Sequence, residues 1–132
     1  MSDVFISYSR DDKSVASTLS EALEEKGFSV FKGDKIVAGV GFVDQIERAL
    51  NEAKAVVVLW TPASTNNEWV REEASYARDQ NKLLPLLMVP NGHVPPSLLN
   101  RHGVKLRNST SGELDPSSIE KLASAIRNMM AR

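Results

Sequence analysis

The sequence predicts an α/β fold in which a parallel β-sheet carries helices on both of its faces. Five short apolar runs alternate along the chain with other segments, most of which have apolar residues at helical spacing, as repeated strand–helix units require. Residues 55–60 are β-branched and apolar on both faces, which is typical of a central parallel strand. The 132 residues suit one domain, residues 1–132, either alone or as the N-terminal module of a longer protein.

The first half of the chain predicts two strand–helix units. Residues 4–8 are an apolar run and predict the first strand. A stripe with helical spacing follows at Val15, Leu19, Ala22 and Leu23. Gly27 is a typical helix C-cap, and residues 28–31 predict the second strand. A loop with three glycines covers residues 32–41, and the second helix is predicted to start near Phe42.

The strand at residues 55–60 is followed by a helix whose N-cap has several candidates. Thr65 and Glu68 have the spacing of a capping box, and Asn66 or Asn67 are alternative caps. Residues 83–89 predict the fourth strand, and the missing N–H of Pro85 predicts imperfect pairing there.

The last part of the chain predicts a connection, a strand and a helix. Residues 90–101 leave room for at most one helical turn, and residues 104–106 predict a short final strand. The last helix should begin at Asp115 and Pro116, because proline is favoured at the first helical position. Its apolar stripe is Ile119, Leu122, Ala123, Ile126, Met129 and Met130.

Composition restricts the classes of function. Sixteen basic and seventeen acidic residues nearly cancel, which favours neutral partners or small ligands over a nucleic-acid or membrane surface. The chain has no cysteine, so thiolate chemistry and disulfides are excluded. No apolar run approaches a membrane span and the N-terminus does not resemble a signal peptide, so we expect a soluble, cytoplasmic protein.

Several catalytic motifs are absent or incomplete. Gly39 and Gly41 precede a helix, but Asp44 and the long loop do not fit a dinucleotide fingerprint. His93 and His102 have no carboxylate at ligand spacing, so no metal site is predicted. The pair Asp11 and Asp12 is best explained as a helix N-terminus, since the third strand ends at Trp60 and Thr61 rather than at a phospho-accepting aspartate.

Glu73 occupies an unusual place for an acidic residue. At roughly 100° per residue, it falls within one arc of about 140° together with Trp69, Val70, Ala74 and Ala77. A carboxylate in such a stripe loses water and needs a partner or a ligand. We therefore expect Glu73 either to perform chemistry, or to pair with Arg10 or Lys35, or to reach water along its own stem.

The loops after the first three strands should meet at one edge of the sheet, because parallel strands all end at the same edge. Ligands of such folds bind at this edge. These loops carry Ser9 and Arg10, residues 32–41, and the segment from Thr61 to the Glu73 helix. Trp60 and Trp69 could form a stacking platform there or serve packing.

Taken together, these segments resemble a Toll/interleukin-1 receptor (TIR) domain over nearly the whole chain. The resemblance lies in residues 3–8, residues 27–31, the loop reaching Gly39, residues 57–59, Trp69-x-x-x-Glu73, and Leu84-Pro85-Leu86. The sequences of residues 60–64 and 69–74 are similar to those of bacterial members in particular. The resemblance implies a flavodoxin-like fold with a five-stranded parallel sheet in the order 2-1-3-4-5.

The resemblance also implies a function. Many bacterial, plant and axonal members cleave the nicotinamide–ribose bond of NAD⁺, whereas others are catalytically silent adaptors. It makes Glu73 the catalytic residue, with NAD⁺ as substrate and no cofactor. The substrate-binding residues implied are Tyr8, Ser9, Arg10, Asp34, Lys35, Phe42 and Trp69. The BB loop, implied in self-association, comprises Lys32, Gly33, Ile36, Val37, Ala38, Gly39, Val40 and Gly41.

Two positions depart from the family pattern, since many members have an acidic residue at Gly33 and a small one at Trp60. The function we expect is an NAD⁺ glycohydrolase or cyclase, activated by self-association into a homo-oligomer or filament in bacterial immune or stress signalling. The alternatives are a non-enzymatic adaptor that recruits other TIR domains and an effector that subverts the TIR pathways of a host.

Overall fold

The computed structural model describes residues 3–32, 42–88, 94–99, 104–105 and 114–131. The strands are β1 (Val4–Ser7), β2 (Val30–Lys32), β3 (Ala55–Trp60), β4 (Leu83–Leu87) and β5 (Val104–Lys105). The helices are α1 (Lys13–Glu25), α2 (Phe42–Glu52), α3 (Glu68–Asp79) and α4 (Pro116–Met130), with short 3₁₀ turns η1 (Arg10–Asp12) and η4 (Pro96–Leu98).

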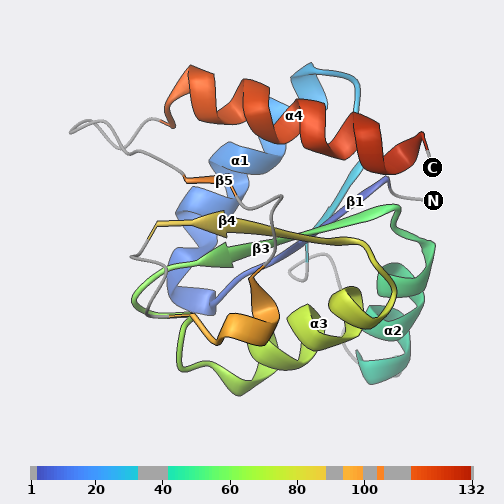
Figure 1. The fold of residues 1–132 in the computed structure, drawn as a ribbon, viewed down its shortest axis with the longest axis vertical. Coiled ribbons are helices and arrows are strands. Elements are labelled where there is room, and N and C mark those ends of the chain that lie inside the picture. Colours follow the sequence, from blue (N-terminus) through green and yellow to red (C-terminus); the bar gives the residue numbers. More distant parts are fainter. Residues whose placement is uncertain (1–2, 33–41, 89–93, 100–103, 106–113, 132) are drawn as a thin grey trace.

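The strands form one parallel five-stranded sheet in the order β2-β1-β3-β4-β5 (Figure 1). This confirms the predicted fold class and strand order. In Figure 1, α1 and α4 cover one face of the sheet, and α2 and α3 cover the other. Among the described residues, no helix has the length and apolarity needed to cross a membrane.

Alternate residues of the strands supply two separate cores. Val4, Ile6, Val57 and Leu59 face α1 and α4, whereas Phe5, Val56, Val58 and Trp60 face α2 and α3. Each face of β3 is therefore fully covered, and all six of its residues are buried. This agrees with its prediction as the central strand.

The second strand begins later than predicted, at Val30 instead of Phe28. Gly27 has a φ of 97°, and the backbone N–H of Phe28 donates to Leu23 O at 3.2 Å. The chain thus ends α1 with a glycine in the left-handed region, as predicted. Phe28 completes this turn and packs in the α1/α4 core, so pairing with β1 starts two residues further on.

Pro85 interrupts the sheet less than predicted. The register of β4 with β3 runs unbroken from Leu83 to Leu87. Lys82 O and Met88 N both bond to β3, so by alternation the nitrogen of Pro85 faces the other neighbour, β5. Among the described residues, the pairing with β5 involves Leu86 and Leu87, after the residue that lacks an N–H. The predicted ends of these two strands, Val89 and Leu106, lie outside the described residues.

The helix starts follow the sequence signals in part. Asn67 is the N-cap of α3, and its side-chain oxygen accepts from Val70 N at 3.1 Å. The capping box at Thr65 and Glu68 is therefore not the cap. Asp115 is the N-cap of α4 and Pro116 its first residue, as predicted.

A buried lysine fixes the C-terminal end of α2. Lys82 lies just before β4 with 7% of its surface exposed. Its ammonium donates to the carbonyl oxygens of Leu50, of Ala53 at 2.9 Å and of Asn51 at 3.3 Å. These carbonyls belong to the last turn of α2 and to the residue that follows it, where a helix has no intrahelical donors for them. Lys82 therefore ties α2 to the sheet.

Lys82→Met should lower the free energy of unfolding by roughly 2–3 kcal/mol, because it leaves buried carbonyls without their donor. Urea unfolding followed by circular dichroism measures the effect. Lys54→Met, at an exposed lysine two residues beyond α2, is the matched control and should change stability by less than about 0.5 kcal/mol. Equal effects of the two substitutions would contradict the role of Lys82.

Candidate active site

Helix α3 carries the residue that the sequence singled out. Its buried residues are Val70, Glu73, Ala74 and Ala77, so Glu73 does lie in the apolar stripe. Only 6% of Glu73 is exposed. A carboxyl group removed from water in this way needs a hydrogen-bond partner inside the protein.

Ser7 is one such partner. Its hydroxyl donates to Glu73 Oε1 at 2.7 Å. Ser7 is the last residue of β1 and is 1% exposed, and strand alternation puts it on the same face as Phe5, under α3. The bond therefore holds the Glu73 carboxyl against the carboxyl end of a central strand.

Burial raises the pKa of Glu73 to about 7, while the hydrogen bonds from Ser7 and Trp69 oppose this rise. Desolvation disfavours the charged carboxylate, and hydrogen bonds donated to the carboxylate favour it. Desolvation is the larger effect. The group consequently changes charge near neutral pH, where small changes in its surroundings alter its protonation.

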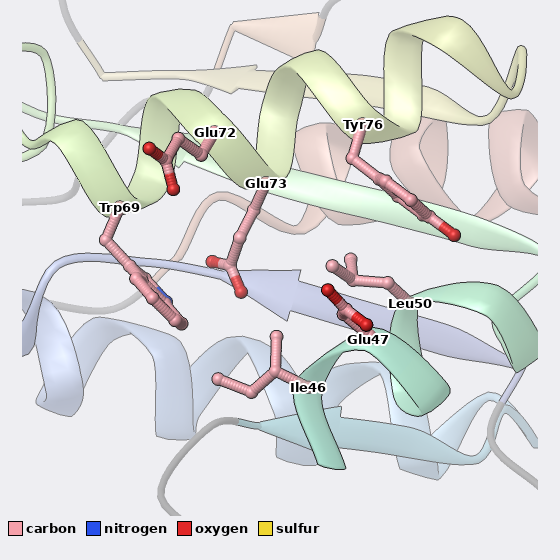
Figure 2. Close-up of a pocket in the computed structure, with 7 residues that line it drawn as sticks. All are labelled: Ile46, Glu47, Leu50, Trp69, Glu72, Glu73 and Tyr76. Carbon is pink, nitrogen blue, oxygen red and sulfur yellow. The ribbon is translucent and has the colours of Figure 1, made fainter. Parts of the chain in front are cut away.

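The Glu73 carboxyl borders a pocket between α2 and α3 with a volume of about 190 Å³. Figure 2 shows the carboxyl pointing from α3 toward β1, with Trp69 beside it. The residues that line the pocket are Ile46, Glu47, Leu50, Trp69, Glu72, Glu73 and Tyr76. Trp69 is 39% exposed, so its indole forms part of the pocket's open side.

Polar contacts hold α2 and α3 together near the pocket. The Tyr76 hydroxyl donates to Asn51 Oδ1, and Gln80 Nε2 donates to the same oxygen at 3.4 Å. With Lys82 capping the end of α2, the two helices that form the pocket walls are fixed on this side. These contacts therefore hold the α2 and α3 walls of the pocket in place before any ligand binds.

The structure separates the predicted substrate-binding residues. Trp69 lines the pocket with Glu73. Tyr8 packs against the α1/α4 core, on the opposite face of the sheet. Ser9 is buried just before η1, and Arg10 is exposed within η1. Among these described residues, Tyr8, Ser9 and Arg10 do not line the pocket, and Glu73 is hydrogen-bonded by Ser7 and Trp69 rather than by Arg10.

The remaining predicted residues lie in or beside the glycine loop. Phe42 is the first residue of α2, and Lys32 is the last residue of β2. Asp34 and Lys35 lie outside the described residues, as do Gly33, Ile36, Val37, Ala38, Gly39, Val40 and Gly41 of the BB loop. Their assigned roles stay predictions.

Trp60 serves packing rather than a stacking platform. It is fully buried in the core beneath α2 and α3, the same core that contains Ile46 and Leu50, and it does not itself line the pocket. Its indole nitrogen has no hydrogen-bond partner among the described residues. The large side chain of Trp60, at a position where many family members have a small residue, is therefore accommodated inside the core.

Other polar groups at this sheet edge have structural roles. Thr61 Oγ1 donates to Asp12 Oδ2, which ties the loop after β3 to the start of α1. This agrees with the interpretation of Asp11 and Asp12 as a helix N-terminus. Within the described part of the chain, no group of His, Asp and Glu side chains is arranged to hold a metal ion, and His93 and His102 lie outside that part.

Sequence reasoning missed most of the pocket wall. The lining residues not predicted are Ile46, Glu47, Leu50, Glu72 and Tyr76, and Ser7, the hydrogen-bond donor to Glu73, was not predicted either. Ser7 was identifiable, because it is the one hydroxyl in an otherwise apolar strand and shares a face with Phe5. The α2 residues were not, because only tertiary packing determines which helix faces α3.

Ser7→Ala should raise the pKa of Glu73 further above 7, because it removes a hydrogen bond that favours the carboxylate. The carboxyl carbon of Glu73, followed by NMR across pH 5–9 in roughly 0.5-unit steps, measures this directly. Ser20→Ala is the matched control, since Ser20 is also a buried serine but contacts Glu24 on the far side of the sheet. An unchanged Glu73 titration in Ser7→Ala would contradict the assignment.

The comparisons with known proteins agree with this fold. A family model described as TIR domain matches residues 4–123. A metazoan TIR-STING receptor from C. gigas is 24% identical with a TM-score of 0.75, over 96% of this chain and 40% of the receptor. The TIR domain of the Toll-related receptor TRR-2 from Hydra magnipapillata is 22% identical with a TM-score of 0.69, over 99% of this chain and 97% of that domain.

A third similar structure comprises the TIR domains of the activated Roq1 resistosome, which directly recognizes the pathogen effector XopQ. It is 19% identical with a TM-score of 0.70, over 96% of this chain and 99% of that one. The comparison with curated proteins gave no match. At these identities the solved structures establish the fold, and the family match over most of the sequence establishes membership. The chain belongs to the TIR domain family.

Proposed function

We propose that this TIR domain cleaves the nicotinamide–ribose bond of NAD⁺ and that Glu73 is its catalytic residue. The observation that carries the proposal is the buried Glu73 carboxyl, held by Ser7 beside Trp69 at the wall of a pocket. Buried carboxyl groups with a raised pKa in a cleft are enriched at functional sites. The likeness of the Trp69 and Glu73 spacing to NAD⁺-cleaving members of the family supports the same choice.

The chemistry requires only one acid. Nicotinamide carries a positive charge while bound to the ribose and leaves as a neutral molecule when the bond between its nitrogen and ribose C1′ breaks. No proton has to be donated to it, in contrast to ordinary glycosides, which need a second carboxyl group. The carboxylate of Glu73 stabilises the positive charge that develops at C1′. Attack by water then gives ADP-ribose, and attack by a group of the same molecule gives a cyclic isomer.

The volume of the pocket fits one end of this substrate. At about 190 Å³ it is smaller than the roughly 300–1,000 Å³ of sites that enclose a whole drug-sized ligand. We therefore infer that the nicotinamide end enters the pocket and that the phosphates and adenine lie outside it. A cation placed beside Glu73 favours the charged carboxylate, which is the form that the reaction uses.

We further propose that self-association activates the domain in bacterial immune or stress signalling. TIR domains occur in the assembled, activated Roq1 resistosome, to which this chain is similar in fold. The BB loop would form the contact. Gly39→Pro should then reduce both self-association and activity, because it restrains the backbone of this loop.

Purified protein at high concentration, incubated with NAD⁺ and resolved by chromatography, tests the function. We expect nicotinamide together with ADP-ribose or a cyclic isomer, in amounts that increase more than linearly with protein concentration. Intact NAD⁺ at every concentration, together with binding to other TIR domains, would contradict the enzyme and favour an adaptor.

A further inference from the structure

The charged residues that line the pocket, within the described part of the chain, are all acidic. Three of its lining residues, Glu47, Glu72 and Glu73, carry carboxyl groups, and none of the described lining residues is basic. Glu47 comes from α2 and Glu72 from α3, so the two exposed carboxylates approach from opposite walls. Figure 2 shows Glu72 on α3 and Glu47 on α2, with Glu73 pointing from α3 toward β1.

The basic side chains of the two helices do not offset this charge at the pocket. Arg71 Nε donates to Thr65 O at 2.7 Å, and Arg78 bonds Asp79 at 3.0 Å. Arg48 is exposed on α2 and, like these two, does not line the pocket. Among the described residues, the charged side chains that a ligand meets between α2 and α3 are therefore acidic on both sides.

The uncharged part of the lining suits a flat ring. Ile46 and Leu50 supply an apolar wall from α2, while Trp69 and Tyr76 supply aromatic groups from α3. Aromatic faces attract cations through their negative π-clouds. An apolar, aromatic pocket with carboxylates at its opening binds a positively charged ring better than a neutral ring of the same shape.

We propose that Glu47 and Glu72 are specificity-determining residues that make this pocket select rings with a permanent positive charge over neutral and anionic rings. The inference rests on the proposed function, since it concerns the same pocket. It adds a consequence for turnover. The ring loses its charge when the bond to ribose breaks, so the two carboxylates hold the reactant more strongly than the nicotinamide product.

Binding of three small probes to the ¹⁵N-labelled protein tests the proposal without requiring cleavage. The probes are 1-methylnicotinamide, a permanent cation, nicotinamide, which is neutral, and nicotinate, an anion. Shifts of the Trp69 indole N–H signal report binding at the pocket. We expect affinity to fall in that order, and the preference for the cation to shrink as salt screens the charges.

The variants Glu47→Gln and Glu72→Gln should each weaken binding of 1-methylnicotinamide by about two- to fivefold, the range expected for exposed charge pairs. Binding of nicotinamide should stay unchanged. Glu52→Gln is the matched control, because Glu52 is exposed on α2 but does not line the pocket. In NAD⁺ cleavage the two pocket variants should raise KM with little change in kcat, as loss of uniform binding predicts.

Equal affinities for the three probes, no binding of any, or pocket variants that behave like Glu52→Gln would overturn the inference even if NAD⁺ is cleaved. Conversely, selection of the cation that depends on both glutamates, in a protein that leaves NAD⁺ intact, would support the inference and refute the proposed reaction. Thermal unfolding of each variant verifies that it is folded, which the exposure of these side chains leads us to expect.

Discussion

Glu73→Gln is expected to lower the rate of NAD⁺ cleavage by at least about a hundredfold while leaving the fold intact. Glutamine has the size of glutamate, and its side-chain oxygen can still accept the hydroxyl of Ser7. The substitution therefore removes the negative charge and leaves one acceptor oxygen for the two donors Ser7 and Trp69. The charge is what stabilises the developing cation at ribose C1′, so kcat should fall much more than KM rises.

Initial rates at pH 8, measured at the same protein concentration for both proteins, give the comparison. Glu52→Gln, which removes an exposed acid of α2 outside the pocket, should retain the wild-type rate. If Glu73→Gln cleaved NAD⁺ at a rate within about threefold of wild type, the charge of this residue would not be the source of catalysis.

The same substitution should make the protein more stable above neutral pH. The folded-state pKa of Glu73 is about 7, above the ordinary value of 4.5, because burial penalises the charge. The folded protein thus holds this proton more tightly than the unfolded chain. The resulting contribution to stability is fully present below pH 4.5 and is lost as the pH rises through 7.

At pH 8 to 9 the wild-type protein carries the cost of a buried charge, and Glu73→Gln does not. The gain should reach about 3 kcal/mol in the free energy of unfolding, since one pKa unit corresponds to about 1.4 kcal/mol. Urea unfolding at pH 5 and pH 8.5 measures it, with a clear gain at the higher pH only. A difference that is the same at both pH values would mean that titration of Glu73 is not its cause.

Much of the fold could be predicted because local patterns report it directly. The unbroken apolar run of β3 indicated a strand covered on both faces, and the alternation of strands and helices indicated the parallel sheet. The stripe around Glu73 predicted its burial for the same reason. Helical and strand periodicity determine which side of an element a residue occupies, and both are visible in sequence.

The site was less predictable because it depends on which elements face each other. Tyr8 and Ser7 are neighbours in sequence but lie on opposite faces of the sheet, so only Ser7 reaches Glu73. Arg10 follows β1, as the prediction assumed, but its side chain is exposed in η1 and does not line the pocket. Lys82 could not be assigned from its surroundings in sequence, because the carbonyls that it caps are about thirty residues away.

If Glu73 is a catalytic group that lowers the stability of the fold, one pair of measurements distinguishes it from a residue that only stabilises the structure. Turnover of NAD⁺ and urea unfolding should be determined at pH 8.5 on the same preparations of wild-type protein and Glu73→Gln. If Glu73 is the catalytic carboxylate, turnover is lost while the free energy of unfolding rises. Loss of turnover together with loss of stability, or retention of turnover, would contradict this assignment.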